Sequence, residues 1–406
     1  MTAIARLMRP VAYLLFALAS VAAHAEGSLV IVGGALRADN AVVWQRIVDL
    51  AGGKGARIAV VPAAAGNPTG SGGRVVQHLN QYGAQAFLLP VSPRLPGDVH
   101  VAANDPANVA AIDQSGGVYF IGGDQARITA AMRNADGTNS AVLDAIWRLY
   151  HRGGVVSGAS AGAAIMSSTM FDNAGTTLAL LQNGVRDGNE LAPGLGFIGK
   201  DVFVDQHLII RGRFARMLPA MLKKSYKRGL GIDENTAVVV GPHHDAEVIG
   251  YKGAIWFDLA QATSNPALGA FNISNVSISY LDHGDRINLD TGAMTPSSDK
   301  IDGKVKPGQT GNEPPLFSAD ILGNTTLVDL MMQLVDSSRP QATGLAFGGP
   351  GANPALPGFS FVLRRTPATE GYESATSEAY SVYRMRLDIT PVKVTWPAVS
   401  DFRAGK

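Results

Sequence analysis

Short runs of β-branched and other apolar residues alternate with stretches of helical periodicity through the first part of the chain. Strands are predicted at 29–32, 57–61, 86–89, 117–121 and 154–157, with helices between them, for example at 41–51 and 75–82. Continuously apolar strands that alternate with helices are typical of a parallel sheet covered on both faces. We therefore expect an α/β fold with a mostly parallel sheet flanked by helices, and a ligand site beyond the carboxyl ends of its strands.

The pattern changes to antiparallel β-structure after about Gly231. A strand is predicted at 237–240, followed by strands at 247–250 and 254–257 that are joined across 251–253 as a hairpin. Beyond about Asn275, loops rich in Gly and Pro separate a helix at 326–335 from strands at 359–363 and 383–389. We expect a catalytic α/β domain at 26–275 and a mixed, β-rich C-terminal extension at 276–406 that packs on it.

The first 25 residues have the order of features found in secretory signal peptides. Arg6 and Arg9 precede a short apolar run from Val11 to Ala23, and Ala23-His24-Ala25 is an A-x-A cleavage site. No later apolar stretch is long enough to span a bilayer. These features predict a signal peptide at 1–25, a secreted or periplasmic protein, and no membrane association after cleavage.

Composition narrows the chemistry. The 406 residues include 34 Lys and Arg against 33 Asp and Glu, so the chain has no basic excess for binding nucleic acid. Cysteine is absent, which excludes disulfides, thiolate zinc sites and a cysteine nucleophile. Eight histidines remain for acid–base or metal chemistry.

The strongest local motif is G-x-S-x-G at Gly158–Gly162, directly after a predicted strand and before a helical stretch. A sharp strand–turn–helix exposes the serine hydroxyl, and the helix N-terminus with the Ala161 N–H can stabilise an oxyanion. Ser160 is therefore a candidate nucleophile, although small-residue turns of this kind also serve to pack a helix against a strand. Ser157 lies within the strand, and we expect it to be structural.

A serine nucleophile needs an imidazole base and a carboxylate that orients it. His207 ends a strand-like run that starts at Asp201, and an arginine-bearing stretch follows it. Glu234 is the best candidate for the carboxylate, with Asp233, Asp205 and Asp172 as rivals. The chain order Ser, His, Glu differs from that of the α/β-hydrolases, in which the acid precedes the histidine.

Four ordered segments resemble the cyanophycinase family, serine peptidases related to the aspartyl dipeptidases. They are Tyr119–Arg127, Ser157–Ala163, the stretch from Asp205 through Arg216, and Gly231–Glu234. The resemblance runs from about Leu29 to Phe257, and with the signal peptide it is closest to the extracellular branch. Ala159 stands where the family often has Thr. The resemblance implies a class I glutamine-amidotransferase-like fold and hydrolysis of cyanophycin, a polyaspartate whose β-carboxyl groups carry arginine, to β-Asp-Arg dipeptides through an acyl-enzyme.

The resemblance also implies roles for individual residues. Ser160 would be the nucleophile, His207 the base and Glu234 its orienting acid. The oxyanion hole would combine the Ala161 N–H with that of Gly123 or Asp124. The positions that the family keeps around the substrate are Gln125, Asp205, Gln206, Arg211, Arg213 and Arg216.

The arginines suit the free carboxylates of such a polymer, and Asp205 suits its guanidinium groups, whereas a solvated surface is the usual place of a short charge cluster. We expect no metal or organic cofactor, cyanophycin or Asp-containing peptides as substrate, and leave a homodimer open. Three alternatives remain: an exported aspartyl or isoaspartyl dipeptidase, a non-catalytic peptide-binding protein, and a metal-dependent hydrolase around His243 and His244.

Overall fold

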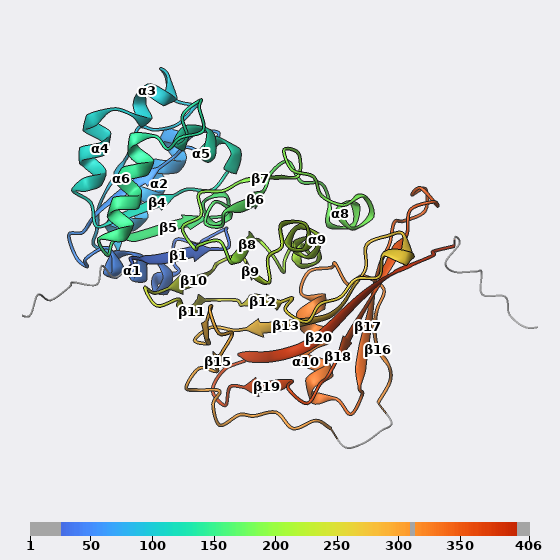
Figure 1. The fold of residues 1–406 in the computed structure, drawn as a ribbon. Coiled ribbons are helices and arrows are strands. Elements are labelled where there is room, and N and C mark those ends of the chain that lie inside the picture. Colours follow the sequence, from blue (N-terminus) through green and yellow to red (C-terminus); the bar gives the residue numbers. More distant parts are fainter. Residues whose placement is uncertain (1–25, 309–312, 396–406) are drawn as a thin grey trace, which may run out of the picture.

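The computed structural model describes residues 26–308 and 313–395, so the predicted signal peptide lies outside the described residues. Within them, two large sheets lie next to each other, and the chain passes from one to the other several times (Figure 1). None of the helices in these ranges has the length and apolar character needed to cross a membrane.

The first sheet carries the predicted parallel strands at its centre. Its order is β15-β14-β11-β10-β1-β5-β4-β2-β3. The parallel part consists of β1 (Ser28–Val32), β5 (Val155–Ala159), β4 (Gly117–Phe120), β2 (Arg57–Val61) and β3 (Gln85–Leu88). Antiparallel strands complete it beyond β1: β10 (Thr236–Val240), β11 (Asp245–Gly250), β14 (Arg286–Asn288) and β15 (Met294–Thr295).

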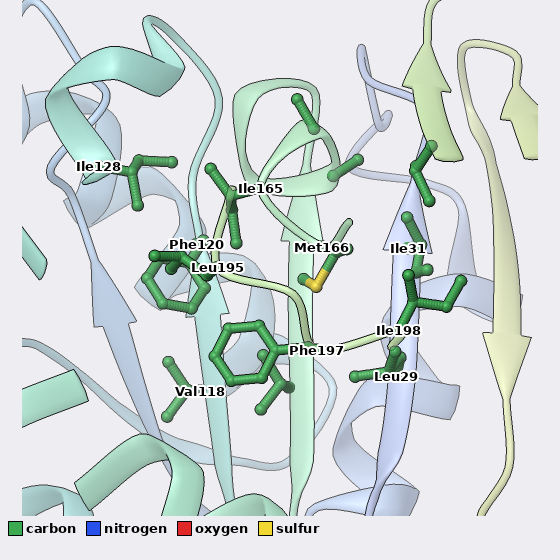
Figure 2. Close-up of a cluster of buried hydrophobic side chains, with 14 of the residues drawn as sticks. Leu29, Ile31, Val118, Phe120, Ile128, Ile165, Met166, Leu195, Phe197 and Ile198 are labelled. Atoms are coloured by element: carbon green, nitrogen blue, oxygen red, sulfur yellow. The ribbon is translucent and has the colours of Figure 1, made fainter. Parts of the chain in front are cut away.

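Successive strand side chains point to opposite faces of this sheet, and helices cover both faces. One face packs on α4 (Pro106–Asp113), α5 (Gln125–Met132) and α6 (Ala141–His151), with α3 (Val99–Ala103) at its border. Figure 2 shows this layer around Phe120 and Phe197. The other face packs on α1 (Ala41–Leu50) and α2 (Pro68–Gln81) through Trp44, Ile47 and Leu79. The strands are therefore apolar on both faces, as the sequence predicts.

The second sheet has the order β16-β17-β18-β20-β13-β12-β9-β8. Its members are β8 (Val202–Gln206), β9 (Arg228–Ile232), β12 (Ala254–Asp258), β13 (Ile273–Leu281), β16 (Leu316–Ser318), β17 (Gln341–Ala346), β18 (Gly358–Arg364) and β20 (Tyr380–Val392), with β19 (Glu370–Glu373) paired to β20. Most of these pairs are antiparallel; β8–β9 and β16–β17 are parallel. This sheet joins the middle of the chain to its C-terminal part.

The second sheet has its own core. The helices α8 (Thr177–Asn183), α9 (Phe214–Lys224) and α10 (Thr326–Asp336) contribute to one apolar cluster with the strands. The smaller elements are α7 (Ala161–Ala164), the 3₁₀ turn Pro266–Leu268, and a hairpin-like pair of β6 (Thr169–Phe171) and β7 (Leu191–Pro193). A buried ion pair ties this part together: Lys300 Nζ lies 2.7 Å from Asp285, and both side chains are fully buried.

The α/β class with a β-rich C-terminal region is confirmed, but two details differ from the sequence analysis. The hairpin predicted across 251–253 is wrong, because β11 pairs with β10 and β14 in the first sheet, whereas β12 pairs with β9 and β13 in the second. Gly250, at φ 108°, lets the chain leave the first sheet there. The boundary predicted at 275/276 falls inside β13, so the extension continues the sheet that contains β8 and β9.

Candidate active site

Ser160 lies in the sharp turn between β5 and α7, with φ 55° and ψ −109°. Non-glycine residues rarely adopt such angles, and the surrounding structure must hold them. A side chain at Gly158 would meet the Gly162 carbonyl oxygen at 2.4 Å, and one at Gly162 would meet the Phe120 carbonyl oxygen at 2.3 Å. The Ser160 N–H donates to the Val32 carbonyl at 3.0 Å. The small residues of the motif thus let the turn form and present Ser160 at the end of the sheet.

The structure brings Ser160, His207 and Glu234 into one hydrogen-bonded chain. Ser160 Oγ lies 2.8 Å from His207 Nε2, and Glu234 Oε1 lies 2.5 Å from His207 Nδ1. A carboxylate at Nδ1 favours the tautomer with the proton on that nitrogen, which leaves Nε2 free to accept the serine proton. Ser160 follows a strand of the first sheet, whereas His207 follows β8 and Glu234 follows β9 of the second.

The glycines after β1 fix the position of the imidazole. The His207 N–H donates to the Gly33 carbonyl at 2.9 Å, with His207 itself at φ 50°. The ring lies against Gly34, where an added Cβ would come within 2.3 Å of ring atom Cε1. Gly34 has φ 117°, a conformation that also favours glycine. The loop after β1 therefore contacts the backbone and the ring of His207 and positions the base.

Burial and charge set the protonation of the pair. Burial lowers the pKa of His207 against the opposing effect of Glu234, so the ring is neutral at neutral pH. Burial works to raise the pKa of Glu234, but the hydrogen bond and charge of His207 and the charge of Arg211 outweigh it. The pKa of Glu234 is lowered as a result, and the group is a carboxylate. A neutral imidazole beside an ionised acid is the state that a general base requires.

The three rival carboxylates have other partners. Asp233 is fully buried, accepts the N–H groups of Ile209 and Ile210, and lies 3.1 Å from Lys252 Nζ. Asp205 is paired with Arg216. Asp172 lines the cavity described below, and among the described residues no hydrogen bond or ion pair joins it to the imidazole. Glu234 is therefore the acid that the fold places at His207.

Backbone donors close to Ser160 differ in availability. The Asp124 N–H donates to the Ala64 carbonyl at 3.0 Å, and its carboxylate caps α5 through the Ala126 N–H. This use of the N–H favours Gly123 over Asp124 as the partner of Ala161 in an oxyanion hole. Gly123 has φ 145° and packs so tightly on Ala64 that an added Cβ would lie 2.2 Å from its carbonyl oxygen.

A polar cavity of about 550 Å³ opens beside the hydroxyl. We call it the arginine cavity, because Arg211, Arg213 and Arg216 line it together with Gln125, Gln206 and the segment Phe171–Ala174. An adjoining cavity of about 570 Å³ shares these arginines and reaches Leu322 in the C-terminal part. Five of the six predicted substrate-binding residues thus line the arginine cavity; Asp205 does not.

The three arginines have different amounts of freedom. Arg216 makes a bidentate ion pair with Asp205 at 2.7 and 2.8 Å, with side chains only 6% and 2% exposed. Arg213 donates to Gln206, and burial with the charge of Arg216 lowers the pKa of Arg213 to about 10, so it stays positive. Arg211 is half-exposed, and its nearest acidic atom is Glu234 Oε1 at 3.4 Å. Arg211 therefore has the most donors left for a ligand.

Two contributors to this site are not predicted from the sequence. Phe171 lies under the Arg216 guanidinium, with 4.3 Å from its carbon to the ring centre, and its carbonyl accepts from Gln125 Nε2. Gly34 lies under the imidazole. The Gly33-Gly34 pair at the end of a predicted strand was a visible signal for the second; Phe171 has no signal in its own neighbourhood, because its partners are distant in sequence.

The other histidines of the described residues do not converge on a metal centre. Across the described ranges, no group of three or more His, Cys, Asp and Glu side chains could hold an ion. His244 lies 3.0 Å from Asp290 in an exposed turn, and His243 is exposed beside it. The alternative of a metal-dependent hydrolase around these two residues therefore has no geometric support.

Comparison with known proteins finds a matching family model and similar chains. Residues 29–248 match the model of "Peptidase family S51". A cyanophycinase from Geminocystis herdmanii is 31% identical over 66% of this chain and 96% of its own. One from a Nostoc species is 27% identical over 68% of this chain and 89% of its own. Among solved structures, a peptidase from an acI-B1 actinobacterium has a TM-score of 0.46 at 22% identity, over 57% of this chain and 90% of its own.

Proposed function

Because the chain belongs to peptidase family S51 and is a serine-type peptidase, we propose that it hydrolyses cyanophycin to β-Asp-Arg dipeptides. The observation that carries the proposal is the hydrogen-bonded chain Ser160–His207–Glu234 at the mouth of an arginine-lined cavity. The names of the cyanophycinase relatives support the substrate. The free carboxylates of this polymer are groups that arginine binds well, and Arg211 has donors to spare.

The mechanism that we propose is acyl transfer through Ser160. His207 Nε2 takes the proton from Ser160 Oγ as the oxygen attacks a backbone carbonyl of the polymer. The N–H groups of Gly123 and Ala161 stabilise the tetrahedral oxyanion. His207 then gives its proton to the departing amine, and an ester to Ser160 remains. Water, deprotonated by His207, cleaves that ester and regenerates the hydroxyl.

The same proposal includes export. Arg6 and Arg9, the apolar run after them and the Ala23-His24-Ala25 cleavage site support secretion or transfer to the periplasm. Cyanophycin outside the cell would then be the substrate that the protein meets.

The test compares the protein with its Ser160→Ala variant on cyanophycin granules, with the products identified by mass. Wild-type protein should release β-Asp-Arg dipeptides with or without a chelator. Ser160→Ala should fall by about 10⁴-fold or more in rate while still binding the polymer. Release of dipeptides by the variant at the wild-type rate, or loss of activity with the chelator, would contradict the mechanism. Cleavage of short Asp-containing peptides in preference to granules would instead favour a dipeptidase.

A further inference from the structure

Ser160 also borders a second cavity, and Arg211, Arg213 and Arg216 are not among the residues that line it. This cavity of about 250 Å³ lies between α2 and the end of the first sheet, and we call it the α2 cavity. Gly122 lines it, whereas its neighbour Gly123 lines the arginine cavity, and Ser160 lines both. The hydroxyl therefore stands at the border between two separate spaces, one large and one small.

One face of α2 forms a wall of this cavity. Ser71, Arg74, Val75 and His78 recur at helical spacing and all line it. Arg74 is exposed, and its guanidinium donates to Ser71 Oγ at 3.2 Å. Trp44 and Tyr119 also line the cavity, and their stacked rings have centroids 5.7 Å apart. No acidic side chain of the described residues forms an ion pair with Arg74.

The chemistry of a peptidase requires room on both sides of the bond that it cleaves. Gly123 lines the arginine cavity, Gly122 lines the α2 cavity and Ser160 lines both, so the two cavities together offer the polymer room next to the hydroxyl in two places. A volume of about 250 Å³ lies below the usual range for a drug-sized ligand, so the cavity suits a short part of the substrate. A guanidinium with no acidic partner in a cavity otherwise poor in charge favours an anion, and a carboxylate matches its planar fork.

We propose that the α2 cavity is a substrate subsite, and that Arg74 binds a carboxylate of the polymer unit across the cleaved bond from the unit in the arginine cavity. The inference rests on the proposed function. It adds a specificity-determining residue far in sequence from the site: Arg74 selects for a carboxylate-bearing residue on that side of the bond, and Ser71 positions it.

The test uses Arg74→Gln and three synthetic four-unit Asp-Arg oligomers. The parent has every arginine carboxylate free; in the other two, the arginine of the unit on one or the other side of the cleavage point is a carboxamide. The kcat/KM of the wild-type protein should be about tenfold lower on each amide than on the parent, because each amide loses one charge-assisted hydrogen bond. The kcat/KM of Arg74→Gln on the parent should be about tenfold below that of the wild type. The variant should cleave the parent and the oligomer amidated on the α2-cavity side equally well, and it should still cleave the oligomer amidated on the other side more slowly.

Arg94→Gln is the matched control, because Arg94 is exposed and lines neither cavity. It should behave as wild type on all three oligomers. Equal kcat/KM for Arg74→Gln and wild type on the parent would overturn the inference, as would equal discrimination against both amides in the variant. A wild-type protein that leaves the parent oligomer and the granules intact would overturn the proposed function itself, so the two failures are distinguishable.

Discussion

The two sheets contribute to the candidate site in different ways. The first supplies Ser160 through a turn whose determinants lie within five consecutive residues, Gly158–Gly162, plus the backbone of its neighbouring strands. The second supplies His207 and Glu234 from the ends of β8 and β9, and these strands belong to a sheet that continues into the C-terminal part. The nucleophile therefore depends on local structure, whereas the base and its acid depend on pairing between distant segments.

This difference shows that the C-terminal part supports the strands that position His207 and Glu234. β9 pairs with β12, β12 with β13, and β13 with β20, so residues near the C-terminal end are connected by unbroken pairing to the strand before Glu234. Leu322 also lies against Gly212, which stands between Arg211 and Arg213, and a Cβ at Gly212 would meet the Leu322 carbonyl oxygen at 2.0 Å. The extension is thus part of the scaffold of the base and of the arginines.

Removal of residues 297–406 should have the largest effect. It takes away β20, the partner of β13, and it takes Lys300 from the buried carboxylate of Asp285. We expect loss of cooperative unfolding and of polymer hydrolysis, because apolar strand faces and a strand edge become exposed. Thermal denaturation followed by circular dichroism and size-exclusion chromatography measure this. A monomeric, fully active truncated protein would show that the two regions are independent.

Glu234→Gln should come next, with about a 10³-fold fall in kcat and little change in stability. The amide cannot hold the imidazole in the required tautomer or stabilise the imidazolium that forms. Steady-state kinetics with an unfolding curve for the same sample separate the two effects. Glu378→Gln, a change at an exposed carboxylate that lines neither the arginine cavity nor the α2 cavity, is the control and should keep wild-type kinetics.

The pH profile of these proteins gives a second measurement of the same contact. Activity requires the neutral imidazole, so it falls as pH drops through the pKa of His207, and that pKa is already lowered by burial. The wild-type acid limb should therefore lie below pH ~6.5, the ordinary histidine value. Glu234 opposes the lowering, so the residual activity of Glu234→Gln should show an acid limb at still lower pH. A limb that moves upward would contradict this account.

Arg216→Met should reduce stability by about 3–5 kcal/mol, because it leaves the buried Asp205 carboxylate without its partner. Arg211→Met, at the half-exposed arginine, should change stability by less than about 1 kcal/mol. The double variant Asp205→Leu/Arg216→Met should recover much of the loss, since no buried charge remains. Urea denaturation of the four proteins measures these differences; equal stability of the two single variants would show that the ion pair has no structural role.

The sequence predicted most accurately what is local. The parallel strands and the serine turn follow from apolar runs and small residues that are adjacent in the chain. The hairpin across 251–253 was predicted wrongly because nothing in the two strands shows that they belong to different sheets. Asp205 was assigned to the substrate because its charge was visible and its burial beside Arg216 was not. Arg74 had no signal at all, since its position near Ser160 arises only when α2 packs on the first sheet.

The contact between Gly34 and the His207 ring has a consequence for comparing natural or laboratory variants of this chain. A single methyl group at position 34 would occupy the space of the imidazole, so the ring would have to swing away from the serine. Such a protein would keep Ser160, His207 and Glu234 and still be inactive. A comparison of catalytic side chains alone would classify it as an active enzyme, and the residue at position 34 is needed to recognise that it is not.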